Sequence, residues 1–124
     1  LKRIYSSNVS VKFLHNDALC GVSLKYLPEL GINLFNMGFD TSLNELKDKT
    51  DNQVVMLGNI PPRDVLASGS EKMIIDHSQK MMKNLKDYSR IIFSCGGGMP
   101  PNVSTESIKT FCNTIYSFPN SQYK

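Results

Sequence analysis

The feature that most constrains the fold is a repeated alternation of short apolar segments with segments of helical spacing. Four segments rich in β-branched or aromatic residues are typical of strands: 9–14, 32–37, 53–57 and 90–94. Apolar residues recur at helical spacing over 18–30, over 42–49, after Ser68 and after Ser104. The strand segments are continuously apolar, which is typical of parallel strands covered by helices. We therefore predict an α/β fold of four successive parallel βα units.

Boundary residues support these helices. Gly31 supplies a stop after 18–30, although Pro28 shortens or kinks the last turn. Ser68 and Glu71 form a capping-box pattern ahead of a helix with Ile74, Ser78, Met81, Leu85 and Tyr88 on one face. Ser104 is the expected N-cap of a last helix, which buries Ile108, Phe111, Cys112, Ile115 and Tyr116.

The length of the chain narrows the choice of α/β fold. The 124 residues amount to one domain. A (βα)8 barrel typically takes about 250 residues, so four units in this length indicate half of such a barrel. The chain opens at Leu1 without an initiator Met and already in helix-like sequence over 1–5, so we expect a partial start.

Charge and composition bear on location and partners. The formal charge is +3, and the basic residues are scattered, which argues against a nucleic-acid partner. No apolar run reaches the roughly 18 residues of a membrane span, and no secretory signal opens the chain. We expect a cytoplasmic protein with reduced thiols, because Cys20, Cys95 and Cys112 lack a CxxC spacing. Cys20 and Cys112 are expected in the core, whereas Cys95 ends a strand.

Polar residues gather just where each apolar strand stops. The four clusters are 15–17, then Asn36 with Phe39 and Asp40, then 59–63, and finally 95–101. In parallel α/β folds the ligand site lies at the carboxyl ends of the strands. The clusters are therefore predicted to share one pocket rim.

His15 and Asp17 are the strongest catalytic candidates. Residues two apart on an extended segment project to the same side, so both side chains can reach one ion or one proton. The pair is either a set of metal ligands, a proton-transfer pair, or a histidine held in a structural loop. Zinc sites usually need three protein ligands. His77 lies in mid-helix and is interpreted as a solvated surface residue.

The glycine run Gly96, Gly97 and Gly98 lets backbone N–H groups approach a ligand, and the helix after Ser104 adds partial positive charge. Binding of a carboxylate or phosphate is one interpretation, and a tight turn into two prolines is the other. Arg63 follows a Pro-Pro turn at the same rim. It either pairs a substrate carboxylate or is a solvated residue at a helix start.

Two segments resemble the uroporphyrinogen decarboxylase superfamily, which includes corrinoid-dependent methyltransferases. The first runs over 57–62 as Leu-Gly-Asn-Ile-Pro-Pro and continues with Val65, Leu66 and 69–71. The second is the glycine- and proline-rich stretch 96–108. The resemblance covers roughly 9–115 and implies that residues 1–124 are units five to eight of a (βα)8 barrel.

The resemblance implies a tetrapyrrole decarboxylase that needs no cofactor. Arg63 and the backbone of Gly96, Gly97 and Gly98 would bind substrate carboxylates, and Asn59 stands in the matching Gly-Asn segment. The partner would be a small-molecule tetrapyrrole, with no membrane and no nucleic acid involved.

Methyltransferase members of the superfamily imply an alternative. They hold zinc with a His-x-Cys pair and a Cys in the final glycine turn, where this chain has His15, Asp17 and Gly97. That interpretation brings zinc at His15 and Asp17 and a corrinoid protein as partner. A third possibility is a non-catalytic or degenerate barrel fragment that binds a tetrapyrrole, a corrinoid protein or a like chain in a homodimer.

Overall fold

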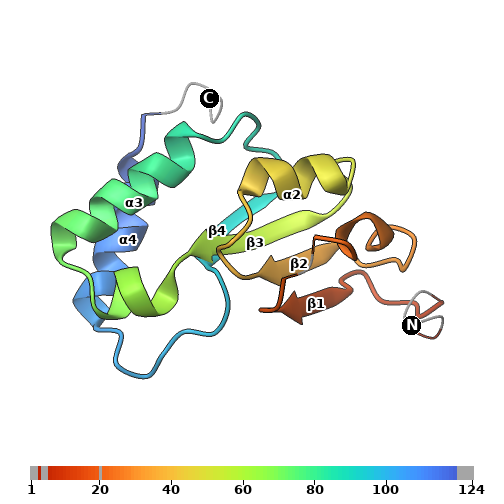
Figure 1. The fold of residues 1–124 in the computed structure, drawn as a ribbon, viewed down its shortest axis with the longest axis horizontal. Helices are drawn as coiled ribbons and strands as arrows, with labels where there is room; N and C mark the ends of the chain where they lie inside the picture. The colour runs from red at the N-terminus through yellow and green to blue at the C-terminus, as the bar shows by residue number, and fades with distance from the viewer. Residues whose placement is uncertain (1–2, 4–5, 20, 120–124) are drawn as a thin grey trace.

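A computed structural model describes residues 3, 6–19 and 21–119, so the expectations for 1–5 and Cys20 concern positions wholly or partly outside the described residues. The described chain forms one parallel sheet in the order β1, β2, β3, β4 (Figure 1). The strands are β1 (Phe13–Asn16), β2 (Leu34–Met37), β3 (Val55–Ile60) and β4 (Ile91–Cys95). Each strand pairs with the next strand of the sequence, as the βα alternation predicted.

Helical segments connect and follow the strands. They are the short 3-10 turn η1 (Leu24–Tyr26), α2 (Leu43–Lys49), the π-helical turn η2 (Pro62–Ala67), α3 (Glu71–Lys83) and α4 (Thr105–Ser117). The predicted four parallel βα units are confirmed by this topology. Within the described residues, no helix is long and apolar enough to span a membrane.

Helices α2, α3 and α4 begin alike, at a serine in extended backbone conformation. The side chains of Ser42, Ser70 and Ser104 each accept a hydrogen bond from the backbone N–H three residues on. The predicted cap at Ser104 is confirmed. The predicted cap at Ser68 is wrong, because Ser68 closes η2 with its N–H bonded to the Arg63 carbonyl, and Ser70 takes the cap of α3.

The predicted helix over 18–30 is wrong. Only η1 forms there, with bonds from residue i to i−3, such as Leu27 N–H to the Leu24 carbonyl. Pro28 offers no N–H to continue an α-helical ladder from Leu24, which explains the break. Leu19 and Val22, which the spacing placed on the buried face, are 88% and 84% exposed.

Other boundaries moved by a few residues. The first strand begins at Phe13 rather than 9, so His15 lies on the strand itself. The third strand extends to Ile60, past the predicted end at 57. Helix α3 ends at Lys83, so Leu85 and Tyr88 pack from the loop that follows. Tyr116 is 89% exposed, because α4 packs on α3 and η2 through one narrow face.

The two faces of the sheet differ. Helices cover one face, where Phe35, Met37 and Met56 are fully buried in the main core. A second core lies under η2, α3 and α4 around Ile60 and Phe111. On the opposite face, strand register aligns His15, Asn36, Leu57 and Ile92 in one row. Ile92 is 48% exposed there, so within the described residues this face has little cover.

Candidate functional site

All four strands end at the same edge of the sheet because they run parallel. The last strand residues are Asn16, Met37, Ile60 and Cys95. The loops that follow these residues therefore meet at this edge, and they carry most of the predicted site residues.

Asn36 holds His15 from the neighbouring strand. The two residues are register partners, and His15 Nδ1 lies 2.6 Å from Asn36 Oδ1. The Asn36 amide nitrogen donates to the carbonyls of Leu57 at 2.6 Å and Cys95 at 3.1 Å. Asn36 is 6% exposed. Its hydrogen bonds link β2 to the three other strands, β1, β3 and β4.

These bonds determine which nitrogen of His15 carries a proton. Both N–H groups of Asn36 are engaged with carbonyls, so its Oδ1 is left to face His15 as an acceptor. The reverse orientation of the amide would set its oxygen against two carbonyl oxygens. His15 Nδ1 is therefore the donor, and in the neutral ring Nε2 keeps its lone pair.

Nε2 of His15 faces Asp17. The ring nitrogen lies 3.1 Å from Asp17 Oδ2, and both side chains are about half exposed. At this distance the lone pair of His15 Nε2 and the carboxylate oxygen of Asp17 repel each other unless a positive charge lies between them. That charge is either a proton on Nε2, which makes an ion pair, or a bound cation.

Asp17 also contacts the glycine turn. Gly97 has φ +95°, and a Cβ added there would lie 2.6 Å from Asp17 Oδ1. Gly97 is thus required twice, by its left-handed backbone and by the carboxylate that occupies the space of a side chain. Asp17 is held between β1 and the β4–α4 loop.

A cavity of about 270 Å³ opens beside this contact. It joins four of the loops at the strand ends and is lined by Asp17, Gly38, Phe39, Pro62, Arg63, Gly96, Gly97 and Gly98. Five of the predicted site residues therefore line one cavity, and His15 is hydrogen-bonded to one of them.

Arg63 is mostly exposed at the mouth of this cavity. Its Nε donates to Asp64 Oδ1 at 2.8 Å, and this hydrogen bond raises the pKa of Arg63 and lowers that of Asp64. Among the described residues, the two terminal nitrogens of Arg63 make no hydrogen bond. They remain available to an anion.

Two residues lie apart from this cavity. The Asn59 side chain donates to the backbone carbonyls of Thr41 and Gly38 and lines a neighbouring cavity. Cys95 is buried, and its thiol donates to the Gly97 carbonyl at 3.2 Å. The sequence analysis did not predict the contact of Asn36 with His15. The signal for this contact was an amide inside an otherwise apolar strand.

The cation that this geometry allows would have few protein ligands. In the described part of the chain, no group of three or more His, Cys, Asp or Glu side chains is placed to hold a metal. His15 and Asp17 supply two donors, and Asn36 orients the first of them as outer residues do in metal sites.

The sequence and the fold of this chain both resemble those of known proteins. The family model described as uroporphyrinogen decarboxylase matches residues 3–118. The solved structures include a methyltransferase from Methanosarcina mazei, which superposes with a TM-score of 0.78 at 18% sequence identity. The match covers 94% of this chain and 34% of that chain, so this chain spans about a third of its structural relative. None of the curated proteins matches the sequence. The structural likeness confirms the predicted fold class, half of a (βα)8 barrel.

Proposed function

We propose a function for this chain from one premise: it belongs to the uroporphyrinogen decarboxylase family. The proposed function is uroporphyrinogen decarboxylase-like chemistry on a carboxylate-bearing tetrapyrrole. In this proposal residues 1–124 are units five to eight of the family's barrel and contribute its carboxylate-binding rim.

The observation that carries this proposal is the shared cavity at the strand ends. Arg63 presents two free terminal nitrogens there, and Gly96 to Gly98 bring backbone to the cavity wall without side chains. Together they suit a carboxylate group. The cavity, at about 270 Å³, admits one carboxylate arm.

His15 is the residue proposed to move the proton. In a decarboxylation the bond between carbon and the carboxyl group breaks, carbon dioxide leaves, and the carbon takes up a proton. With Nδ1–H committed to Asn36, Nε2 of His15 is the atom that takes or gives this proton, and Asp17 stabilises the protonated ring.

A fluorescence titration with uroporphyrin tests the binding step. The chain should give a saturable change at micromolar protein, and Arg63→Gln should weaken binding about three- to tenfold, since an exposed ionic contact contributes on the order of 1 kcal/mol. Arg90→Gln is the matched control, because it removes the same charge at the opposite edge of the sheet. No saturable change, or equal weakening by both variants, would contradict the proposal.

Corrinoid-linked methyl transfer is a second candidate. Two observations favour it: the convergence of His15 Nε2 and Asp17 Oδ2, and the fold shared with a methyltransferase. Zinc sites usually have at least three protein ligands, whereas the described residues supply two. His15 and Asp17 are therefore an incomplete set of ligands for zinc.

Metal analysis separates the candidates. We would measure zinc in the purified chain and in His15→Ala, with His77→Ala as the control at the second histidine of the sequence. Stoichiometric zinc that disappears only in His15→Ala would favour methyl transfer with a corrinoid protein as partner. Zinc in none of them would remove that candidate. Uroporphyrin binding, together with no release of carbon dioxide from added uroporphyrinogen, would instead indicate a non-catalytic binding protein.

A further inference from the structure

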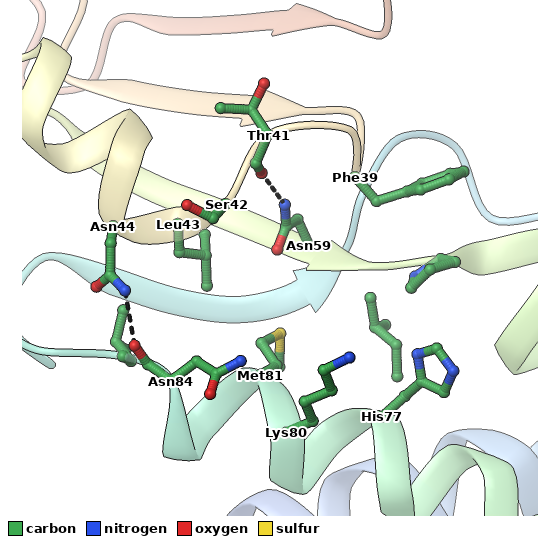
Figure 2. A pocket seen from close by; sticks show the side chains of 13 residues that line it. Phe39, Thr41, Ser42, Leu43, Asn44, Asn59, His77, Lys80, Met81 and Asn84 are labelled. Carbon is green, nitrogen blue, oxygen red and sulfur yellow. Dashed lines mark hydrogen bonds between the residues drawn. The ribbon is translucent and has the colours of Figure 1, made fainter.

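A second cavity lies on the helix-covered side of the sheet, between α2 and α3. Its volume is about 300 Å³, slightly larger than that of the cavity at the glycine turn. Figure 2 shows the side chains that line it, which come from the β2–α2 loop and the start of α2, the end of β3, and one face of α3. Phe39 lines both cavities.

Two helices of different length flank the cavity. Helix α2 has 7 residues, whereas α3 has 13. Asn44 fixes the spacing of the two helices. Its amide nitrogen donates to the Asn84 carbonyl at 2.6 Å, and its Oδ1 accepts from Lys86 N–H at 3.0 Å.

The wall at the sheet is equally fixed. The Asn59 amide nitrogen donates to the Thr41 carbonyl at 2.9 Å and to the Gly38 carbonyl at 3.4 Å (Figure 2). These bonds tie the end of β3 to the β2–α2 loop. A ligand would therefore enter a space whose polar walls are already hydrogen-bonded, which lowers the entropic cost of binding.

The charge of the lining is one-sided. Lys80 and His77 extend from α3 toward the strand that carries Asn59 (Figure 2), and no Asp or Glu lines the cavity. Over the described ranges, neither of these two side chains makes a hydrogen bond or an ion pair with another residue. Four of the eight other lysines that the structure describes, Lys47, Lys49, Lys72 and Lys109, each pair with a carboxylate.

The rest of the lining is divided almost evenly between apolar and polar residues. Phe39 is 45% exposed and stands at one side of the cavity, and Met81 and Leu85 come from α3 and the residues that follow it. Ile60 and Pro61 close the end of β3. An exposed aromatic ring and an unpaired ammonium group in the lining of one cavity suit a ligand with an apolar body and a negative head.

We propose that this cavity binds a small organic carboxylate: an aromatic or branched apolar body against Phe39 and Met81, with its carboxylate at Lys80 and His77. This site shares Phe39 with the cavity at the glycine turn but includes neither His15 nor Arg63, so its test does not depend on the tetrapyrrole function. The size of the cavity limits the ligand to a small molecule.

Phenylacetate is the probe, and phenylacetamide is its neutral match in size and shape. Titration of each into the ¹⁵N-labelled chain, followed through backbone amide shifts, reports both the location and the affinity of binding. We expect phenylacetate to shift the amides of 39–44 and 77–85 saturably at millimolar concentration. Phenylacetamide should bind at least about threefold more weakly, because it lacks the charge.

Lys80→Met tests the assigned cation, because it keeps the apolar stem and the helix propensity while removing the ammonium group. We expect it to weaken phenylacetate binding about three- to tenfold. Lys83→Met is the matched control, on the same helix but outside the lining. Equal binding of the amide and the acid, equal affinity in the two variants, or shifts confined to the uncovered face around Phe13 and Ile92 would each overturn the proposal.

Discussion

Replacement of Asn36 by leucine should release His15 from its fixed tautomer. Asn36 is the only group shown to accept from Nδ1 among the residues described, and leucine has the same branching of side-chain heavy atoms but neither accepts nor donates a hydrogen bond. In the wild-type chain we expect the neutral ring to carry its proton on Nδ1. In Asn36→Leu the neutral ring should distribute its proton between both nitrogens.

The cost in stability follows from three lost hydrogen bonds. Asn36 makes one bond with His15 and two with the carbonyls of Leu57 and Cys95, and it is buried. A typical net contribution of about 1 kcal/mol per bond gives roughly 3 kcal/mol. Burial of the leucine side chain offsets about 1 kcal/mol of this loss. The free energy of unfolding should therefore fall by roughly 2 kcal/mol, a change that urea denaturation measures.

The tautomer is measured by long-range ¹H–¹⁵N correlation spectra of the histidine rings, with His15 assigned by its absence in His15→Gln. Leu34→Ala is the control, because residue 34 lies two positions earlier on the same strand and face and touches neither bond of His15. It should lower stability and leave the tautomer unchanged. A neutral wild-type ring protonated at Nε2, or an unchanged tautomer in Asn36→Leu, would refute the hydrogen-bond reasoning.

Three further predictions concern the glycine turn and the opposite edge of the sheet. Gly97→Ala should cost about 1–3 kcal/mol in urea denaturation, and Asp17→Ala in the same chain should recover the steric part but not the cost of the positive φ. Lys47→Met should cost about 1–3 kcal/mol by the same assay, because the 6%-exposed side chain of Lys47 donates to the carbonyls of Asp87 and Ser89, which would lose their partner. Hydrogen bonds from the Lys47 ammonium and from Ser89 hold the pKa of Asp87 well below its usual range. The contribution of the Asp87 carboxylate to the stability of the fold is therefore complete above about pH 4 and is lost as the pH falls further. Asp87→Asn should therefore flatten the acid side of the stability curve, and an unchanged curve would contradict this pairing.

The order of elements was predictable because buried parallel strands have a distinctive composition. Residues 32–37 and 90–94 are mainly apolar, and both became strands within one or two residues of the expected limits. The segment 18–30 was not predictable from spacing alone. Its leucines satisfy a helical pattern, but Pro28 removes a needed N–H, and the chain folds back through turns that bury Leu24 and Leu27 and expose Leu19.

The gathering of site residues was predictable from topology, but their individual orientations were not. Parallel strands bring their carboxyl ends to one edge, which is enough to place Asp17, Arg63 and Gly97 around one cavity. Asn59 lines the neighbouring cavity instead, because its amide nitrogen donates to two backbone carbonyls of the β2–α2 loop. A sequence gives no information about such choices between nearby acceptors.

The contact between Asp17 and Gly97 links the two positions at which this chain departs from the methyltransferase pattern. The resemblance expects a cysteine at each of them, yet here the carboxylate of Asp17 fills the space in which any side chain of residue 97 would have to begin. A larger residue at 97 is therefore incompatible with Asp17 in its present position, and Asp17 can turn toward His15 because residue 97 has no side chain. The two departures are sterically one change. The methyltransferase pattern has one histidine and two cysteines, whereas this chain has one histidine and one carboxylate. This arrangement is better suited to holding a proton than to holding zinc.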